Sequence, residues 1–469
     1  MQVEAFRIAV PDAVLADLRE RLARTRFPDE IEDSGWRYGT DLAYLRELVA
    51  HWLDAYDWRA AEEALNRFPQ FKARVGDLGI HFIHARGVGP KPFPLVITHG
   101  WPGSVAEFSK IIEPLTDPAR HGGDPADAFD VIAPSMPGYG FSDHARTPGM
   151  DAERIAALWV ELMRGLGYRR FGAQGGDWGA MVSTYLGANH ADAVAGIHLN
   201  MVVAFPPDPA NPLDGLTQDE AIDLMPMQDW MREEAGYQRI QGTKPQTLGY
   251  ALNDSPVGLA AWIVEKFRSW SDCDGDVERR FTKDELLTNI MLYWVPQTAT
   301  SSARLYYEMM HAGKFPPTGF RVDVPTGCAI FPREIMKPPR SWVDRLYNVT
   351  QWTRFPAGGH FAAMEEPSAL VEDVRSFFRP LREGWPCRTR APRHRVAIRW
   401  RAIPAWRSRR SARCWRGFAP ASPSWGLASW SRASASSCAG WRSPIRPRRR
   451  ARPACRCGSG PGWSWSAWS

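Results

Sequence analysis

The sequence predicts an α/β protein with a mainly parallel sheet, a helical insertion and an N-terminal extension. Short apolar runs alternate with helical stretches between residues 91 and 204, which is typical of parallel strands joined by helices. Residues 205–310 break this alternation with polar and aromatic helical sequence, and the strand pattern resumes over residues 311–384. We therefore expect one core in two segments, with the insertion lying over the edge of its sheet as a lid.

Residues 1–90 form the predicted extension. They are rich in helix formers and end in two short runs, FKARV and IHFIHA, on either side of GDLG, a pattern that indicates a hairpin. Aromatic residues recur along the segment, so we expect a hydrophobic arm that packs against another domain.

The core segments supply the remaining predicted strands and helices. The strand runs are FPLVIT, FDVIAP, RRFGAQ and VAGIHL before the insertion, and VPTGCAIFP and VTQWTRFP after it. Helical periodicity follows most of these runs, and the last predicted helix is EEPSALVEDVRSFFRPL. The carboxyl ends of such strands are where functional groups gather in open parallel sheets.

Composition indicates a water-soluble globular protein. Of the 469 residues, 44% are hydrophobic and 23% are charged. No run of 18 or more apolar residues occurs, so we expect no membrane anchor. The N-terminus lacks a basic stretch followed by an apolar one, which argues against a secretory signal, and we expect a cytoplasmic protein. No metal-ligand spacing of Cys and His is present, and we expect neither a metal nor an organic cofactor.

Residues 385–469 differ from the rest of the chain. They hold 19 arginines, no lysine and no acidic residue, so residues 1–384 carry 39 basic and 52 acidic side chains and a net charge of −13. An acidic body argues against a nucleic-acid partner. The segment has 10 of the 22 tryptophans and shows no periodicity. We predict a frameshifted or disordered tail, and the alternative is an RNA- or membrane-binding arm.

The stretch AQGGDWGAM presents Asp177 between glycines, directly after a predicted strand and before a helix. Esterases place a serine nucleophile at the centre of the similar pattern G-x-S-x-G, on a strained turn that small neighbours make possible. A carboxylate in that position can attack carbon and form an ester. The alternative is an ordinary aspartate at a helix N-terminus. The strand and helix on either side favour the nucleophile.

The stretch HGWPGS follows the first core strand and predicts an oxyanion hole. In this architecture the loop contributes one backbone N–H, for which Trp101 is the candidate, and the N–H of Trp178 is its partner. His99 in the same loop could be read as a catalytic base, but a role in orienting the loop is favoured.

His360 lies on a glycine-rich turn just before the final helix. This late position agrees with the chain order nucleophile, acid, histidine that α/β-hydrolases use. The acid that orients the histidine is predicted to be Glu334, just past a strand, with Asp323 and Asp344 as rivals. The competing interpretation of Glu334 is an exposed side chain beside Arg333.

Together these motifs make the chain resemble the microsomal-type epoxide hydrolases of the α/β-hydrolase superfamily. The resemblance covers about residues 2–382 and depends on HGWPGS, MPGYGFS, GGDWGAM, LNDSPVGLAAW, SSARLYYE, VPTGCAIFPREI and GGHFAAMEEP. It implies an α/β-hydrolase fold with a mainly parallel sheet, a helical lid and an N-terminal extension that wraps the core. It also implies a small-molecule epoxide as substrate and a role in detoxifying xenobiotic compounds. It is compatible with a homodimer and leaves the oligomeric state open.

The resemblance assigns roles to individual residues. Asp177 matches the nucleophile, His360 the general base and Glu334 its acid partner. Tyr237 and Tyr306 match a pair of lid tyrosines that activate the epoxide oxygen, although Tyr307 is adjacent to the second. From composition alone these tyrosines are lid packing, as are the other lid aromatics that indicate an apolar pocket, Trp230, Trp262 and Trp294.

Two other functions compete with an epoxide hydrolase. A haloalkane dehalogenase also uses an aspartate nucleophile, but it binds halide through N–H donors and does not need phenolic acids. A non-catalytic α/β-hydrolase that serves as a binding protein is the second alternative. The set Asp177, Glu334 and His360 argues against it.

Overall fold

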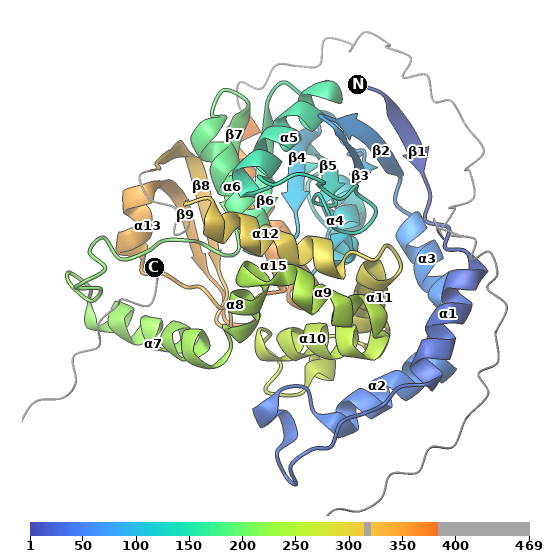
Figure 1. The fold of residues 1–469 in the computed structure, drawn as a ribbon. Coiled ribbons are helices and arrows are strands. Elements are labelled where there is room, and N and C mark those ends of the chain that lie inside the picture. Colours follow the sequence, from blue (N-terminus) through green and yellow to red (C-terminus); the bar gives the residue numbers. More distant parts are fainter. Residues whose placement is uncertain (314–319, 383–469) are drawn as a thin grey trace, which may run out of the picture. The chain divides into compact units, whose positions relative to one another are not determined.

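The computed structural model describes residues 1–313 and 320–382, and the tail predicted for residues 385–469 lies outside them (Figure 1). Within the described residues one sheet contains nine strands in the order β1-β2-β3-β5-β4-β6-β7-β8-β9. The strands are β1 (Val3–Phe6), β2 (Gln70–Val75), β3 (Leu78–Ala85), β4 (Phe93–Thr98), β5 (Phe129–Pro134), β6 (Phe171–Gly175), β7 (Val194–Leu199), β8 (Val322–Ile330) and β9 (Tyr347–Arg354).

The strand directions confirm the predicted mainly parallel sheet. The run from β5 through β4, β6, β7 and β8 to β9 is parallel throughout. The first three strands are antiparallel, and β3 joins them to the parallel run by pairing with β5. The predicted hairpin is confirmed, because β2 and β3 are antiparallel neighbours with Val75 opposite Leu78.

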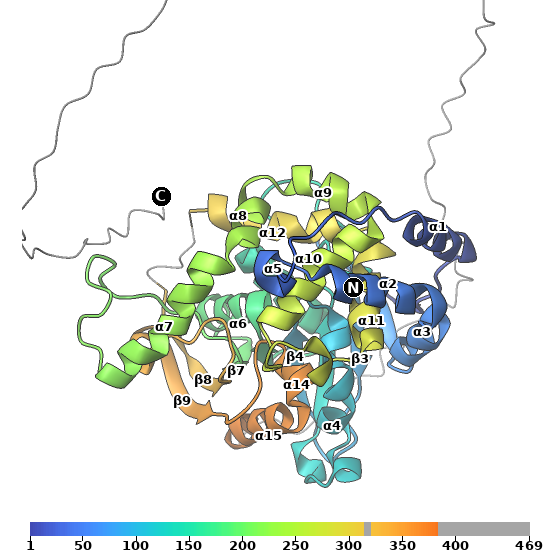
Figure 2. The same cartoon turned by 90° about the horizontal axis from the view of Figure 1, so that it is seen from below.

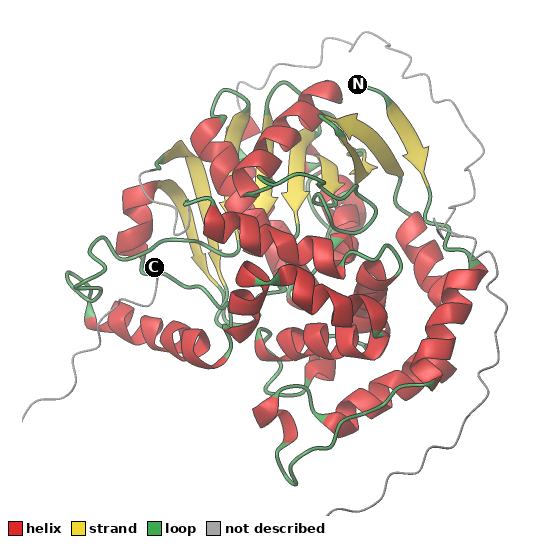
Figure 3. Ribbon diagram, in the orientation of Figure 1, coloured by secondary structure: helices red, strands yellow, loops and turns green. Residues whose placement is uncertain are grey.

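Helices cover both faces of the sheet (Figure 3). On one face α5 (Ala152–Gly165) packs against α6 (Asp177–Asn189), which contacts β4, β6, β7 and β8. On the other face α4 (Ile112–Thr116) contacts α15 (Pro367–Phe378), which contacts β7 and β8. Strands buried on both sides explain the near-continuous apolar runs of the sequence, and β4, β5, β6 and β7 are buried at every residue.

The insertion is helical, as predicted. Its helices are α7 (Gln218–Glu233), α8 (Gly236–Thr243), α9 (Pro245–Asp254), α10 (Pro256–Ser269), α11 (Lys283–Trp294) and α12 (Ala299–His311). α12 packs against α8 and α9, and these helices lie beyond the sheet edge toward which the parallel strands point (Figure 1). The shorter helices α13 (Arg340–Leu346) and α14 (Ala362–Glu365) follow β8 and β9.

The N-terminal extension contacts the lid helices. Its helices are α1 (Asp12–Ala23), α2 (Leu42–Asp54) and α3 (Trp58–Asn66). They pack against α10 and α11, and Figure 2 shows the same neighbours from below. Polar contacts reinforce this packing: the Thr40 hydroxyl donates to the Ala261 carbonyl at 2.7 Å, and the Arg21 guanidinium donates to the Asp254 carbonyl at 2.7 Å.

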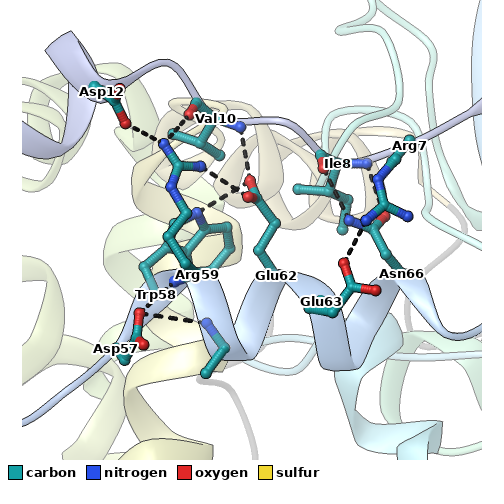
Figure 4. A network of polar contacts seen from close by, with 11 residues as sticks. Arg7, Ile8, Val10, Asp12, Asp57, Trp58, Arg59, Glu62, Glu63 and Asn66 are labelled. Atoms are coloured by element: carbon teal, nitrogen blue, oxygen red, sulfur yellow. Dashed lines mark hydrogen bonds and ion pairs between the residues drawn. The ribbon is translucent and has the colours of Figure 1, made fainter.

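The chain between β1 and α1 is fixed to α3 by paired polar contacts (Figure 4). The backbone N–H of Ile8 donates to Asn66 Oδ1, and Asn66 Nδ2 donates back to the Ile8 carbonyl, both at 2.9 Å. The N–H of Val10 donates to Glu62 Oε1 at 2.7 Å, and Arg59 donates to the Val10 carbonyl at 2.7 Å. An extended segment outside the sheet thus has its backbone groups satisfied by side chains.

None of the helices in the described residues combines the length and hydropathy needed to cross a lipid bilayer.

Candidate active site

Asp177 is the first residue of α6 and lies on the strained turn that joins β6 to this helix. Its φ is +50°, in the left-handed region that non-glycine residues seldom adopt. The turn is tight, because a Cβ on Gly179 would lie 1.8 Å from the Thr98 carbonyl oxygen and a Cβ on Gly175 would lie 2.2 Å from the Gly179 carbonyl oxygen. Glycines two residues on either side of Asp177 therefore allow the turn, which presents its carboxylate at the strand ends.

The loop after β4 holds one oxygen of that carboxylate. The backbone N–H of Trp101 donates to Asp177 Oδ1 at 2.8 Å. Trp178, the residue after Asp177, is in the first turn of α6, where backbone N–H groups have no partner within the helix. The two predicted oxyanion-hole donors are thus next to Asp177 in space or in sequence.

His99 is built into the interior of the same loop. It is 1% exposed, its Nδ1 lies 3.0 Å from the Gly100 carbonyl oxygen, and its Nε2 accepts from the backbone N–H of Met136 at 3.3 Å. Burial lowers the pKa of His99 to about 4, so the imidazole is neutral at pH 7. These contacts occupy both ring nitrogens and leave neither for a substrate.

His360 connects Asp177 with Glu334. His360 Nδ1 lies 2.8 Å from Glu334 Oε1, and His360 Nε2 lies 3.5 Å from Asp177 Oδ2. Because a carboxylate only accepts, Nδ1 carries the hydrogen toward Glu334 and Nε2 faces Asp177. Burial opposes the charged imidazolium, but Glu334 and Asp177 outweigh it and raise the pKa of His360 well above its usual range.

Glu334 is buried, unlike its rivals. It is 5% exposed, and its Oε1 also accepts the backbone N–H of Ile335 at 2.7 Å. Asp323 pairs with Arg321 at 3.0 Å and Asp344 with Arg340 at 3.4 Å, both at exposed positions. The structure therefore brings Glu334, and neither rival, to His360.

Tyr237 in α8 and Tyr306 in α12 meet over the loop that holds Asp177. Their ring centroids are 5.7 Å apart, the Tyr237 ring stacks on that of Trp101 at 5.0 Å, and the Tyr306 ring meets that of Trp101 edge-on at 5.9 Å. Both side chains are buried, and the Tyr306 hydroxyl has no hydrogen-bond partner in the described part of the chain. A buried hydroxyl without a partner indicates a position where a ligand atom can accept.

Both phenols stay protonated at neutral pH. Burial raises the pKa of Tyr237 and of Tyr306 well above the usual 10, and the negative charge of Asp177 raises each further. Tyr307 is 37% exposed and stacks on His311. Of the two adjacent tyrosines, Tyr306 is the one that faces Tyr237.

A small cavity of about 20 Å³ lies between the catalytic candidates. Asp177, His360, Trp101 and Glu107 are among the residues that line it. Its volume suits one water molecule, and the residues that line it do not include Tyr237 or Tyr306.

Glu107, on the 3-10 helix that begins at Val105, also lines this cavity and is not among the residues predicted from the sequence. Burial raises the pKa of its carboxyl to about 8, and the charge of Asp177 acts in the same direction. The sequence signal for it is weak, because it is an acidic residue three positions after HGWPGS whose partial burial only the fold reveals. No group of three His, Cys, Asp or Glu side chains within residues 1–313 and 320–382 is arranged to hold a metal ion.

Parallel strands that lead into a strained turn, with helices inserted before the last two strands, are the architecture of α/β-hydrolases. Residues 94–238 match the family model described as alpha/beta hydrolase fold, and residues 3–108 match the model described as Epoxide hydrolase N terminus. Epoxide hydrolase 1 of Sus scrofa is 40% identical over 400 residues, which span 80% of this chain and 88% of that protein. The chain belongs to the microsomal-type epoxide hydrolase family.

Other relatives are similar to this chain over about the same fraction of its length. Juvenile hormone epoxide hydrolase 2 of Ctenocephalides felis is 37% identical, over 79% of this chain and 84% of that protein. The crystal structure of juvenile hormone epoxide hydrolase from Bombyx mori has a TM-score of 0.75 and 32% identity, covering 81% of this chain and 95% of its own. The Aspergillus niger epoxide hydrolase structure has a TM-score of 0.73 and 29% identity, with 81% and 97% covered.

Proposed function

We propose that this protein is an epoxide hydrolase, which adds water to an epoxide and releases a vicinal diol through a covalent ester on Asp177. One observation carries the proposal. A carboxylate on a strained turn has one oxygen bound by the Trp101 N–H and the other facing His360, while two buried phenols pack against the same Trp101. Relatives named as epoxide hydrolases, matched along the extension, core and lid, support it.

The first half of the reaction opens the ring. An oxygen of Asp177 attacks an epoxide carbon, the carbon–oxygen bond breaks, and the electron pair goes to the ring oxygen. That oxygen takes a proton from one of the two phenols and a hydrogen bond from the other. Because the pKa of each tyrosine lies above 10, both are available as donors at neutral pH.

The second half of the reaction hydrolyses the ester. His360 takes a proton from water, which attacks the carbonyl carbon of the Asp177 ester, and Glu334 stabilises the imidazolium. The N–H groups of Trp101 and Trp178 stabilise the oxyanion. When this intermediate collapses, the bond from the carbonyl carbon to the diol oxygen breaks, and that oxygen takes the proton from His360. The proton of the new Asp177 carboxyl passes to the phenolate, so that the carboxylate and both phenols are restored. Ester formation removes the Asp177 charge, one of the two that raise the pKa of His360. The pKa of His360 therefore falls in the intermediate, the state in which it acts as a base.

The ester route is tested by single turnover with styrene oxide in heavy-oxygen water. The first diol should carry unlabelled oxygen from Asp177, and later turnovers should carry label. Asp177→Ala should lower the diol-forming rate by about 10⁴-fold or more, because the nucleophile is absent. Label in the first diol would exclude the ester and leave direct attack by water.

An alkyl chloride incubated in parallel separates this proposal from a haloalkane dehalogenase. Diol from the epoxide without halide from the chloride supports an epoxide hydrolase, since the phenols donate to an oxygen leaving group. Halide release without diol would overturn the proposal, and neither product would favour a binding protein.

A further inference from the structure

A buried lysine lies over the ring of Tyr237. Lys266 is in α10, and only 5% of its side chain is exposed. Its Nζ lies 5.0 Å from the centroid of the Tyr237 ring and 5.9 Å from that of Trp270. Lysines are seldom buried, and an ammonium within about 6 Å of an aromatic ring centroid is attracted by the ring face. The Lys266 charge is thus directed at a tyrosine of the candidate active site.

Two carboxylates counter the lysine. Lys266 Nζ lies 2.6 Å from Glu265 Oε2 and 3.5 Å from Glu234 Oε2. Burial raises the pKa of Glu265, Lys266 opposes that shift, and Glu234 adds to it. Both acids also act on Tyr237, where they disfavour negative charge. Lys266 is therefore the member of this cluster that can favour such a charge.

Ring opening moves negative charge toward this cluster. Asp177 begins as a carboxylate and ends as a neutral ester, while the ring oxygen gains a proton and the tyrosine that donated it becomes a phenolate. The charge thus leaves the strand ends and reaches the lid. In a buried site a phenolate is costly unless a cation lies nearby.

We propose that Lys266 is a positioning residue that stabilises, through the face of the ring, the phenolate that Tyr237 forms when the epoxide opens. The inference rests on the proposed function, because it needs Tyr237 to give up its proton to the substrate. The proton returns to the phenolate when the ester is hydrolysed, so the enzyme ends each cycle in its starting state. Lys266 thus accelerates the first half-reaction and not the second.

The test is rapid-quench measurement of ester formation and of ester hydrolysis for Lys266→Met, Lys266→Gln and Lys266→Arg. Ester formation should fall about ten- to thirtyfold in the Met and Gln variants, from the loss of a desolvated cation over the ring. Hydrolysis of the ester should not slow, and Lys266→Arg should recover most of the first rate. Lys244→Met is the matched control, because it removes an exposed lid charge next to α8 and should change neither rate.

A pair of substrates distinguishes charge stabilisation from packing. 1,2-Epoxypropane leaves a more basic alkoxide than its 3,3,3-trifluoro analogue and therefore needs more help from the phenol. Lys266→Met should slow the first substrate more than the second. Equal loss on both substrates, equal slowing of both half-reactions, or no recovery with arginine would overturn the inference.

The inference and the proposed function fail in different ways. A wild-type protein that forms neither ester nor diol contradicts the proposed function, whatever Lys266 does. A wild-type protein that forms both, with a Lys266→Met variant of identical ester-formation rate, contradicts the inference alone. Circular dichroism of each variant establishes that it is folded before the rates are compared.

Discussion

The core and the lid hold their parts of the site by different interactions. In the core, directional polar contacts fix the groups: Asp177 accepts from the Trp101 N–H, and His360 donates to Glu334. In the lid, Tyr237 and Tyr306 are held mainly by aromatic packing, and within the described residues the Tyr306 hydroxyl has no partner at good hydrogen-bond geometry. Core substitutions should therefore abolish a single chemical step. Lid substitutions should weaken ring opening by degrees, because two phenols share one task.

The largest expected effect beyond loss of the proposed nucleophile is that of His360→Ala, which removes the proposed base. Ring opening does not need this residue, so the ester should form and accumulate while its hydrolysis slows by about 10³-fold. Intact-protein mass spectrometry should find the enzyme heavier by the mass of one substrate. His121→Ala, at an exposed surface position, is the control and should turn over normally. Turnover by His360→Ala without an adduct would mean that His360 is not the base.

A smaller, graded effect is expected in the lid. Tyr237→Phe and Tyr306→Phe should each slow ester formation about tenfold to a hundredfold, since one phenol remains to donate. The double variant should lose ring opening almost completely, with ester hydrolysis unchanged in either single variant. Tyr307→Phe is the control, because that side chain is partly exposed and stacks on His311. Equal losses in all three variants would show that the site does not distinguish Tyr306 from its neighbour.

The difference between the core and the lid also explains which parts of the site could be predicted from the sequence. Asp177 was recognisable because a strand-to-helix turn is made by residues adjacent in the chain, and the spacing of Gly175 and Gly179 records it. Glu334 and His360 are 26 residues apart on loops at strand ends, so chain order alone only reduced the number of candidate acid partners for His360. Burial, which the structure supplies, separates Glu334 from the exposed rivals.

The lid was predictable as a helical segment but not as a set of facing side chains. Tyr237 and Tyr306 were assigned only by resemblance, because which face of a lid helix meets Trp101 depends on packing between α8, α12 and the core. Glu107 and Lys266 were missed for a related reason. A buried charge looks like any surface charge in a sequence, since burial is a property of the fold.

The smallest expected effect concerns Glu107. This core carboxyl is protonated and neutral at pH 7, whereas the buried Lys266 of the lid is charged. Burial raises the pKa of Glu107 from the usual 4.5 to about 8 in the folded protein. Between these two pH values the carboxyl of Glu107 is ionised in the unfolded chain but still protonated in the folded protein. The contribution of Glu107 to the free energy of unfolding is therefore complete below about pH 4.5 and is lost as the pH rises through 8. Glu107→Gln cannot ionise and should lose less stability over that range.

Denaturant unfolding at pH 5, 7 and 8.5 measures this difference. The free energy of unfolding of Glu107→Gln relative to wild type should rise by on the order of 1 kcal/mol from pH 5 to pH 8.5, a figure reduced for the partial exposure of the side chain. Glu107→Asp keeps an ionisable carboxyl and should retain the wild-type trend. Parallel pH profiles for wild type and Glu107→Gln would mean that Glu107 is already ionised at neutral pH. An ionised Glu107 would place a second negative charge beside Asp177. The core and the lid would then both contain a buried charged side chain, and this difference between them would disappear.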